Sequence, residues 1–219
     1  MYRLLAVVLL CVAWAAAALA SGENDTPIGA STVSLNGIAR GTVCKEGDPV
    51  DWWKVYIEGP TEIVVFLDGV GGDNDQYFYS HSLDLLAQST GSGADEVVFG
   101  GVSGGWYYIK VYRYSSGCSD YYLGVLSADV SGYLWGAEDI DIYRIYMSAG
   151  TTYWIFLTDH SATFNPDLFL ATSEHVIARS NSTGNVDVIK YMPSVSGYYY
   201  IAVGSASGSG DYWLFVGSR

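Results

Sequence analysis

Two pairs of carboxylates have the spacing of a cation site. Asp73 and Asp75 form one pair, and Asp139 and Asp141 form the other. In an extended segment residues two apart point to the same side, so each pair could present oxygens to a hard cation such as Ca²⁺. Calcium takes about six to eight oxygen ligands, so further groups, including Asp167, would have to converge on it. The competing interpretation is solvated turn carboxylates, because no Asp-x-Asp-x-Asp-Gly loop is present.

A nucleophile pattern occurs once, in the segment 101–105, which reads Gly-Val-Ser-Gly-Gly. A nucleophile elbow needs a strand, a sharp turn and then a helix. Here a run of β-forming residues, 106–111, follows Ser103 directly, which is typical of a plain turn between strands. We find no other constellation of catalytic residues and predict that the protein is not an enzyme.

The first twenty residues have the pattern of a secretory signal peptide. A short positive start is followed by an apolar run from Leu4 to Ala17 and by Ala18-Leu19-Ala20, a small-x-small cleavage site. The alternative is an uncleaved N-terminal anchor. We predict a secreted or cell-surface protein with a signal peptide at 1–20, and no later segment is apolar enough to span a membrane.

Secretion determines how the cysteines and two N-glycosylation sequons are interpreted. Cys11 leaves with the signal peptide, so the mature chain keeps Cys44 and Cys118, and an even pair in an exported protein predicts a disulfide. Asn24 and Asn181 each begin an Asn-x-Thr sequence, which predicts N-glycosylation at the surface.

The charge of the chain excludes one class of partner. The formal net charge is −13, and only ten residues are Lys or Arg. Nucleic-acid binding requires a basic surface that neutralises phosphates, so we do not expect it. The acidity fits an extracellular surface or one that recruits divalent cations.

The elements that must position these residues are short β-strands. The segments 105–111 and 197–203 are rich in aromatic and β-branched residues, and each leads through a Gly/Ser turn into a second such run, which predicts a hairpin closing each half of the chain. Gly41 aligns with Gly132, and Asp120-Tyr121 with Asp211-Tyr212, at the same offset. The fold prediction is all-β, with two tandem antiparallel β-sandwich domains, at 32–127 and 128–219, after a flexible leader at 21–31.

Aromatic residues are too numerous along the strands to be hidden on one face. In Trp52-Trp53, Tyr107-Tyr108 and Tyr198-Tyr199-Tyr200, alternation sends neighbours to opposite faces of a sheet. Some large aromatics must therefore face solvent, the other domain or another chain. An exposed patch could stack on sugar rings or pack on another subunit, while most aromatics fill the core.

Each half resembles the bacterial and archaeal pre-peptidase C-terminal domain. The second half carries this resemblance in the segments 139–145, 165–170, 193–203 and 208–212, and the first half in 73–78 and 104–111. The resemblance implies a jelly-roll-like sandwich of the kind appended to secreted proteases. No protease domain accompanies the two halves, so a role in assisting a peptidase does not transfer directly.

These observations predict a secreted, non-catalytic structural or adhesive surface protein. It could assemble with itself into a filament or matrix through strand edges or aromatic patches. The alternatives are a module that binds polysaccharide or matrix protein, and an accessory partner of a secreted protease.

Overall fold

The computed structural model describes residues 24–219, together with the backbone of residues 3–9 and 19–20. It is almost entirely β-structure, and its helical element is a single 3-10 turn, Pro27–Gly29. The predicted all-β class is confirmed. No helix in the described ranges is long and apolar enough to cross a membrane.

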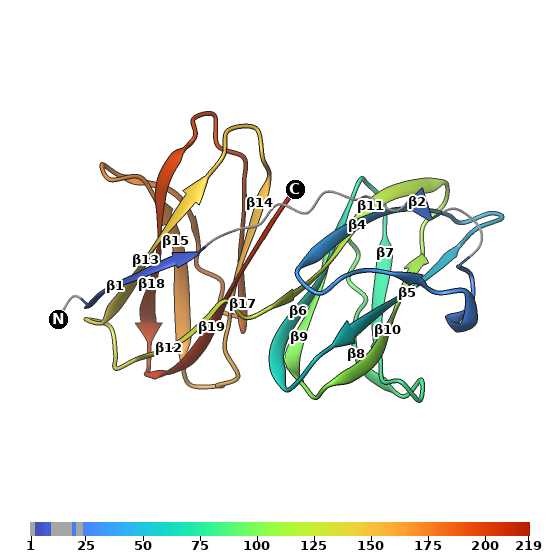
Figure 1. Cartoon of the computed structure of the whole chain (residues 1–219), viewed down its shortest axis with the longest axis horizontal. Coiled ribbons are helices and arrows are strands. Elements are labelled where there is room, and N and C mark those ends of the chain that lie inside the picture. Colours follow the sequence, from blue (N-terminus) through green and yellow to red (C-terminus); the bar gives the residue numbers. More distant parts are fainter. Residues whose placement is uncertain (1–2, 10–18, 21–23) are drawn as a thin grey trace. The chain divides into compact units, whose positions relative to one another are not determined.

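The chain divides into two compact units between Ser127 and Ala128. In the first unit two sheets face each other, and both are drawn in Figure 1. One sheet has the order β3-β5-β10-β7-β8, with strands Ser31–Thr32, Val50–Ile57, Gly105–Arg113, Asn74–Tyr79 and Leu85–Ser89. The other has the order β2-β4-β11-β6-β9, with strands Leu19–Ala20, Gly37–Cys44, Cys118–Ser127, Thr61–Gly69 and Glu96–Val102.

The second unit repeats this arrangement. One sheet has the order β1-β13-β18-β15-β16, with strands Arg3–Leu9, Ile140–Met147, Gly197–Ser207, Asn165–Ala171 and Val176–Ser180. The other has the order β12-β19-β14-β17, with strands Val130–Leu134, Gly210–Ser218, Tyr153–Thr158 and Val186–Tyr191. Apart from β1, β2 and β3, each strand of one unit has its counterpart at the same place in the other.

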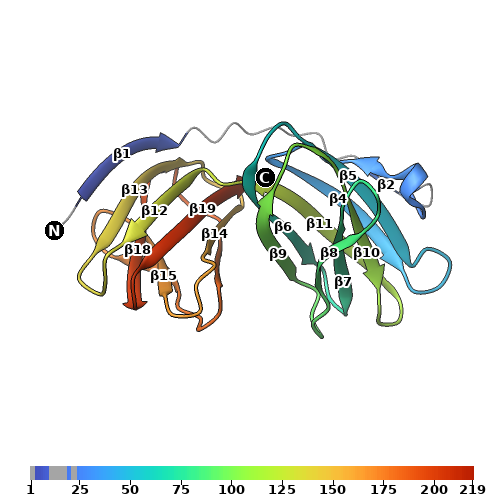
Figure 2. The same cartoon turned by 90° about the horizontal axis from the view of Figure 1, so that it is seen from below.

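The predicted signal peptide is only partly described. Residues 1–2 and 10–18 lie outside the described residues, as do residues 21–23 of the leader. The remaining parts pair as parallel edge strands, β1 with β13 and β2 with β4, and Figure 2 shows β1 running beside β13. Whether 1–20 is removed stays a prediction.

The leader differs from the flexible segment that we predicted. Thr26 caps the 3-10 turn by accepting a hydrogen bond from Gly29 N, and the backbone N–H of Trp52 donates to Asn24 O at 2.7 Å. Ser31 and Thr32 then form β3, which runs parallel to β5. The described part of the leader is therefore held along the edge of β5, because its backbone groups find partners there.

Each unit has its own core between its two sheets. Alternation along β5 buries Trp53, Val55 and Ile57 completely, and along β10 it buries Ile109 and Val111. Complete burial of one such aliphatic side chain stabilises the fold by about 1.5–3 kcal/mol. The second unit buries a matching set, including Tyr143, Ile145, Ile201 and Val203.

A hydrogen-bonded tyrosine crosses the interior of each sandwich. In the first unit the Tyr121 hydroxyl donates to Asp51 and accepts from Trp53 Nε1 at 2.7 Å. The ring lies over Gly41, where any Cβ would clash with it. The aligned glycine is therefore required by a close approach of the ring.

The second unit repeats the arrangement with Tyr212, whose hydroxyl donates to Asp141 and contacts the Tyr143 hydroxyl. Its ring lies over Gly132 in the same way. The residues that repeat between the halves thus include the buried polar groups that fix how the two sheets meet.

Candidate functional site

The outer face of the β5-β10-β7 sheet carries the most unusual surface of the first unit. The core positions of these strands are Trp53, Val55, Ile109, Val111 and Phe78, all at most 4% exposed. Since side chains alternate, the residues between them point to the opposite face. We call this surface the aromatic–lysine face; it consists of Trp52, Lys54, Tyr56, Tyr77, Tyr79, Trp106, Tyr108, Lys110 and Tyr112.

Strand register places these side chains in rows. Lys110, on the central strand β10, lies between Trp52 on β5 and Tyr77 on β7. In the next row, Tyr108 lies between Lys54 and Tyr79. In each of these two rows a lysine therefore lies beside an aromatic ring of the neighbouring strand.

The rings pack in pairs and remain open to solvent. Tyr56 is 50% exposed and Trp106 39% exposed, and their centroids are 5.3 Å apart. Trp52 and Tyr79 lie 5.2 Å apart. Offset and tilted pairs at such distances are favourable, so the rings support one another without being buried.

The ammonium groups of the lysines lie over these rings. Lys110 Nζ is 4.0 Å from the centroid of Tyr77, and Lys54 Nζ is 5.8 Å from that of Trp106. At one end of the face Lys45, which follows β4, donates to the Tyr112 hydroxyl at 2.8 Å. Cation–π contacts of this kind hold a charge in place at a cost in hydration.

Burial shifts the titration of this face. Partial burial lowers the pKa of Lys110, although the neighbouring Asp75 acts in the opposite direction. Burial also raises the pKa of Asp75, which accepts a hydrogen bond from the Tyr77 hydroxyl at 3.2 Å, and raises the pKa of Tyr77 to about 12. The low local hydration strengthens any polar contact that a ligand would make here.

The second unit has the same register but different residues on this face. Lys110, Trp52 and Tyr77 correspond to Ala202, Ile142 and Phe169. The remaining aligned positions of the second face, from β13, β18 and β15, are Arg144, Tyr146, Tyr198, Tyr200, Gly204 and Ala171. Tyr146 and Tyr198 keep one exposed pair, with Arg144 4.6 Å over the Tyr198 ring. The rest of the second face has lost its lysine and several rings.

The predicted calcium ligands are divided between the two units. Asp73 and Asp75 belong to the first unit, and Asp139, Asp141 and Asp167 to the second. Among the described residues, no group of three His, Cys, Asp or Glu side chains is arranged to hold a metal ion. Calcium binding at either pair stays a prediction.

The carboxylates of the second unit have separate local roles. Asp141 points into the sandwich to accept from Tyr212, whereas Asp139 accepts from Trp135 N at 3.1 Å in the turn before β13. Asp167 lies on β15 beside the buried Leu168, so it points to the outer face. Spacing in the sequence missed the role of Asp141 because its partner, Tyr212, lies 71 residues further along the chain.

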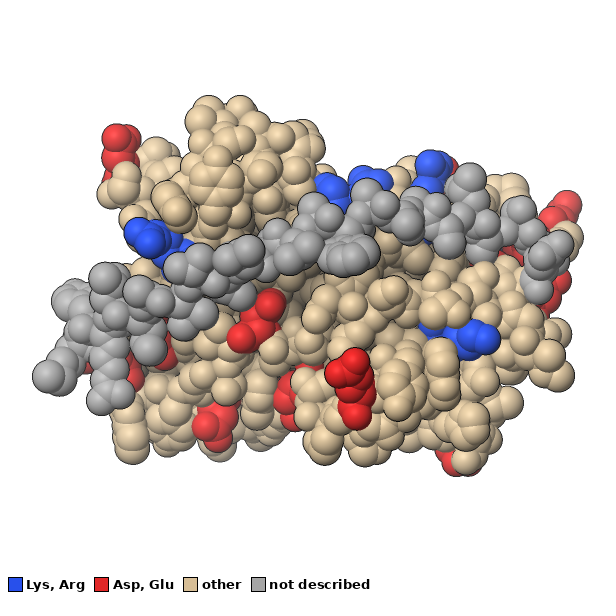
Figure 3. All heavy atoms as spheres, in the orientation of Figure 1, with Lys and Arg blue, Asp and Glu red and all other residues tan. Residues whose placement is uncertain are grey.

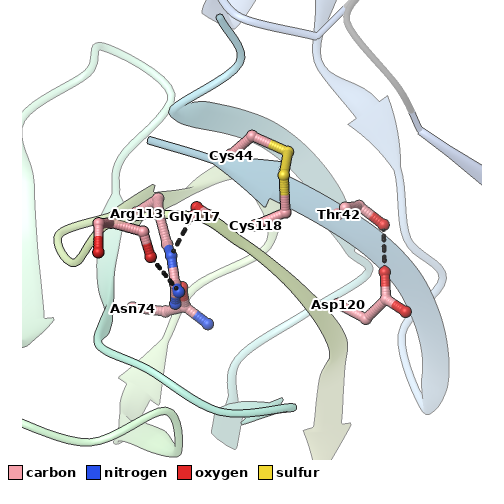
Figure 4. The surroundings of a disulfide bond; sticks show 8 residues. Thr42, Cys44, Asn74, Arg113, Gly117, Cys118 and Asp120 are labelled. Carbon is pink, nitrogen blue, oxygen red and sulfur yellow. Dashed lines mark hydrogen bonds between the residues drawn. A yellow bond between two sulfur atoms is a disulfide. The ribbon is translucent and has the colours of Figure 1, made fainter. Parts of the chain in front are cut away.

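The predicted disulfide between Cys44 and Cys118 is present. The two cysteines lie directly opposite each other on β4 and β11. Figure 4 shows the bond beside the buried guanidinium of Arg113, which donates to Asn74 Oδ1 at 3.0 Å and to Gly117 O at 3.2 Å. Covalent and polar contacts together fix this end of the first unit.

The two sequons lie in different surroundings. Asn24 is 1% exposed, and its amide nitrogen donates to Trp52 O at 3.2 Å. A glycan is attached to that nitrogen, so the folded leader as described disagrees with glycosylation there. Asn181 is exposed between β16 and β17, where glycosylation stays a prediction.

Ser103 forms the turn between β9 and β10, as expected for a plain turn. Its hydroxyl lies 3.2 Å from that of Tyr107. Among the described residues, the structure gives no hydrogen bond between Ser103 and a histidine, the usual base for a serine nucleophile.

Comparison with known proteins supports the family resemblance in the second unit. Residues 139–205 match the family model described as bacterial pre-peptidase C-terminal domain. The predicted resemblance is confirmed. The matched strands β13 to β18 have counterparts in the first unit in the same order, which partly supports the tandem arrangement.

Solved structures with some similarity come from three bacteria. The pre-peptidase C-terminal domain of a collagenase from Bacillus anthracis is 22% identical, with 44% of this chain and 93% of that chain covered and a TM-score of 0.40. A periplasmic inhibitor of g-type lysozyme from Aeromonas hydrophila is 18% identical, with 41% and 83% covered and a TM-score of 0.35. A putative secreted protein from Eubacterium rectale is 12% identical, with 89% and 81% covered and a TM-score of 0.33. No curated protein sequence matches the chain.

Proposed function

We propose that this chain is a non-catalytic extracellular adhesion module that binds a carbohydrate polymer through the aromatic–lysine face. The observation that carries the proposal is the pairing of rings on one outer sheet face, the exposed Tyr56 with Trp106 and the half-buried Trp52 with Tyr79. Flat rings offer their faces to the apolar faces of sugars, and an open sheet accepts an extended polymer without a closed pocket. The match to a pre-peptidase C-terminal domain supports a non-catalytic module.

Retention on insoluble polysaccharides tests the proposal. The mature chain, residues 21–219, is mixed with cellulose, chitin and cross-linked pectin, and the bound fraction is measured. We expect Trp106→Ala combined with Tyr56→Ala to weaken retention by about tenfold, or about 1.4 kcal/mol of binding free energy, because the variant deletes both exposed rings of one pair.

The matched control is Trp135→Ala. Trp135 is 78% exposed in the second unit, so its removal deletes a ring that is more exposed than Tyr56 or Trp106 and lies outside the aromatic–lysine face. We expect retention to be unchanged. Loss of retention with this variant but not with the Tyr56/Trp106 variant would place binding elsewhere and contradict the proposal.

Self-assembly through a sheet edge is a second candidate function. β3 covers the edge of β5 in the first unit, whereas β1 covers the equivalent strand β13 in the second. Removal of residues 1–20 would leave the edge of β13 with unpaired backbone groups, which favour strand addition. Light scattering of the mature chain should then show oligomers that grow with concentration, and monomers throughout the range would reject this function.

A further inference from the structure

The lysines of the chain are unevenly distributed. The sequence contains four lysines, and three of them, Lys45, Lys54 and Lys110, lie on or at the end of the aromatic–lysine face. The molecule is otherwise acidic, with a net charge of −13. Figure 3 shows basic side chains as isolated spots on the face that it draws. A concentration of ammonium groups among aromatic rings is therefore a local departure from the charge of the molecule.

Two of these ammonium groups have no carboxylate at ion-pair distance. In the part of the chain that the structure describes, neither Lys54 nor Lys110 has a carboxylate oxygen within 4.0 Å. Each is instead positioned over a ring, Trp106 or Tyr77. A lysine without a carboxylate at ion-pair distance gains most from a ligand that supplies one.

The two lysines are diagonal neighbours on the adjacent strands β5 and β10. Lys54 lies opposite Tyr108, and Lys110 is two residues further along the same strand as Tyr108. Diagonal neighbours of this kind across an antiparallel pair are roughly 7–8 Å apart. Rings flank both ammonium groups, so sugar stacking and charge pairing can occur on the same polymer.

We infer that the aromatic–lysine face recognises an anionic polysaccharide, one whose sugars carry carboxylates, with Lys54 and Lys110 pairing with the acid groups while the rings stack on the sugars. The inference rests on the proposed carbohydrate-binding function and specifies its ligand class. A neutral glycan would use the rings but leave both ammonium groups without an anion. Asp73 and Asp75, at the Tyr112 end of the face, would repel acid groups, which directs them toward Lys54 and Lys110.

Affinity electrophoresis of the mature chain provides the test. The protein migrates through gels that contain polygalacturonate, a neutral β-glucan or chitosan, and its retardation gives the dissociation constant for each. We expect retardation by polygalacturonate, at least tenfold weaker binding of the neutral polymer, and weakening with added NaCl because exposed charges are screened.

Lysine variants separate this inference from the function on which it rests. Lys54→Gln combined with Lys110→Gln should weaken polygalacturonate binding by about tenfold or more and leave neutral-glucan binding unchanged, as expected for the loss of charge-assisted hydrogen bonds. The matched control is Lys190→Gln on β17, which should bind like the unmodified protein. Unchanged melting temperatures would show that the variants remain folded.

Each other outcome is decisive. Equal binding of neutral and acidic polymers, unaffected by the lysine variants, would overturn the inference and keep the proposed function. Preference for chitosan would overturn the inference, because chitosan carries positive charge instead of negative charge. Retention on collagen fibres and on no polysaccharide would reject both, since the partner would then be a protein.

Discussion

The interiors of the two units are built alike, whereas one outer face differs between them. In both, a buried tyrosine over a glycine donates to an aspartate at the start of the equivalent strand, Tyr121 to Asp51 and Tyr212 to Asp141. On the outside, Lys110 between two rings becomes Ala202 between Ile142 and Phe169. Packing restricts which residues fit at the inner positions, so the two units have similar residues there. Packing does not restrict the outer positions in this way, so their residues are the better indicator of function.

Removal of the disulfide should have the largest effect and should be confined to one unit. Cys44→Ser with Cys118→Ser opens a loop of 74 residues in sequence separation, and we expect the first unit to lose about 2–5 kcal/mol of unfolding free energy. The second unit has Trp135 in place of one cysteine and should be unaffected. Hydrogen exchange of the full-length chain, resolved by unit, measures both values, and equal destabilisation of the two units would show that they do not fold independently.

Substitution of the glycine beneath each buried tyrosine should affect both units alike. The added methyl group of Gly41→Ala or Gly132→Ala would overlap the ring above it, and overpacking of this kind costs about 1–3 kcal/mol. Unit-resolved hydrogen exchange should locate each loss in the unit that carries the change. Gly47→Ala, at a turn glycine with no atom near its Cβ position, is not a neutral control because its φ is +98°, so Gly59→Ala is the better one.

A buried carboxyl should make the stability of the first unit depend on pH. Asp51 is 0% exposed, and burial raises its pKa to about 7, whereas an unfolded aspartate titrates near 3.9. Between these values the folded chain binds the proton more tightly than the unfolded chain does. Stability should therefore fall as pH rises from about 4, by at most about 1.4 kcal/mol per pH unit, and level off above the folded pKa.

The variant Asp51→Asn tests this pH dependence. It keeps an oxygen that can accept the existing hydrogen bond from Tyr121. It should flatten the slope of the first unit over pH 4–7. A slope that persists in Asp51→Asn would mean that another group in the first unit titrates.

Much of the interior could be predicted from the sequence. The repeat, the all-β class and the disulfide follow from local patterns, such as the hairpins that close each half and the even pair of cysteines. The role of Asp141 could not be predicted, because an Asp-x-Asp spacing is the same whether a carboxylate faces a cation or a tyrosine hydroxyl. Its partner, Tyr212, is 71 residues away in sequence.

Only part of the candidate site could be predicted from the sequence. Alternation predicted that residues such as Trp52 or Trp53 must face outward, but not which of the two. That Lys110 lies between Trp52 and Tyr77 depends on the placement of β10 between β5 and β7, which is a long-range pairing. The pattern within one strand does not show which strands lie beside it. The placement of lysines beside rings of neighbouring strands could therefore be seen only in the structure.

The smallest effect that the comparison predicts is that of adding, in the second unit, a lysine at the position equivalent to Lys110. Ala202→Lys puts an ammonium group on β18 beside Phe169 and diagonal to Arg144, the position that Lys110 occupies on β10. The exposed pair of Tyr146 and Tyr198 already provides rings nearby, so we expect polygalacturonate binding to strengthen a few-fold in affinity electrophoresis. The control is Ala202→Gln, which adds length without charge and should change nothing. If both variants strengthen binding equally, side-chain bulk rather than charge distinguishes the two faces, and the lysines of the first face would lose their assigned role.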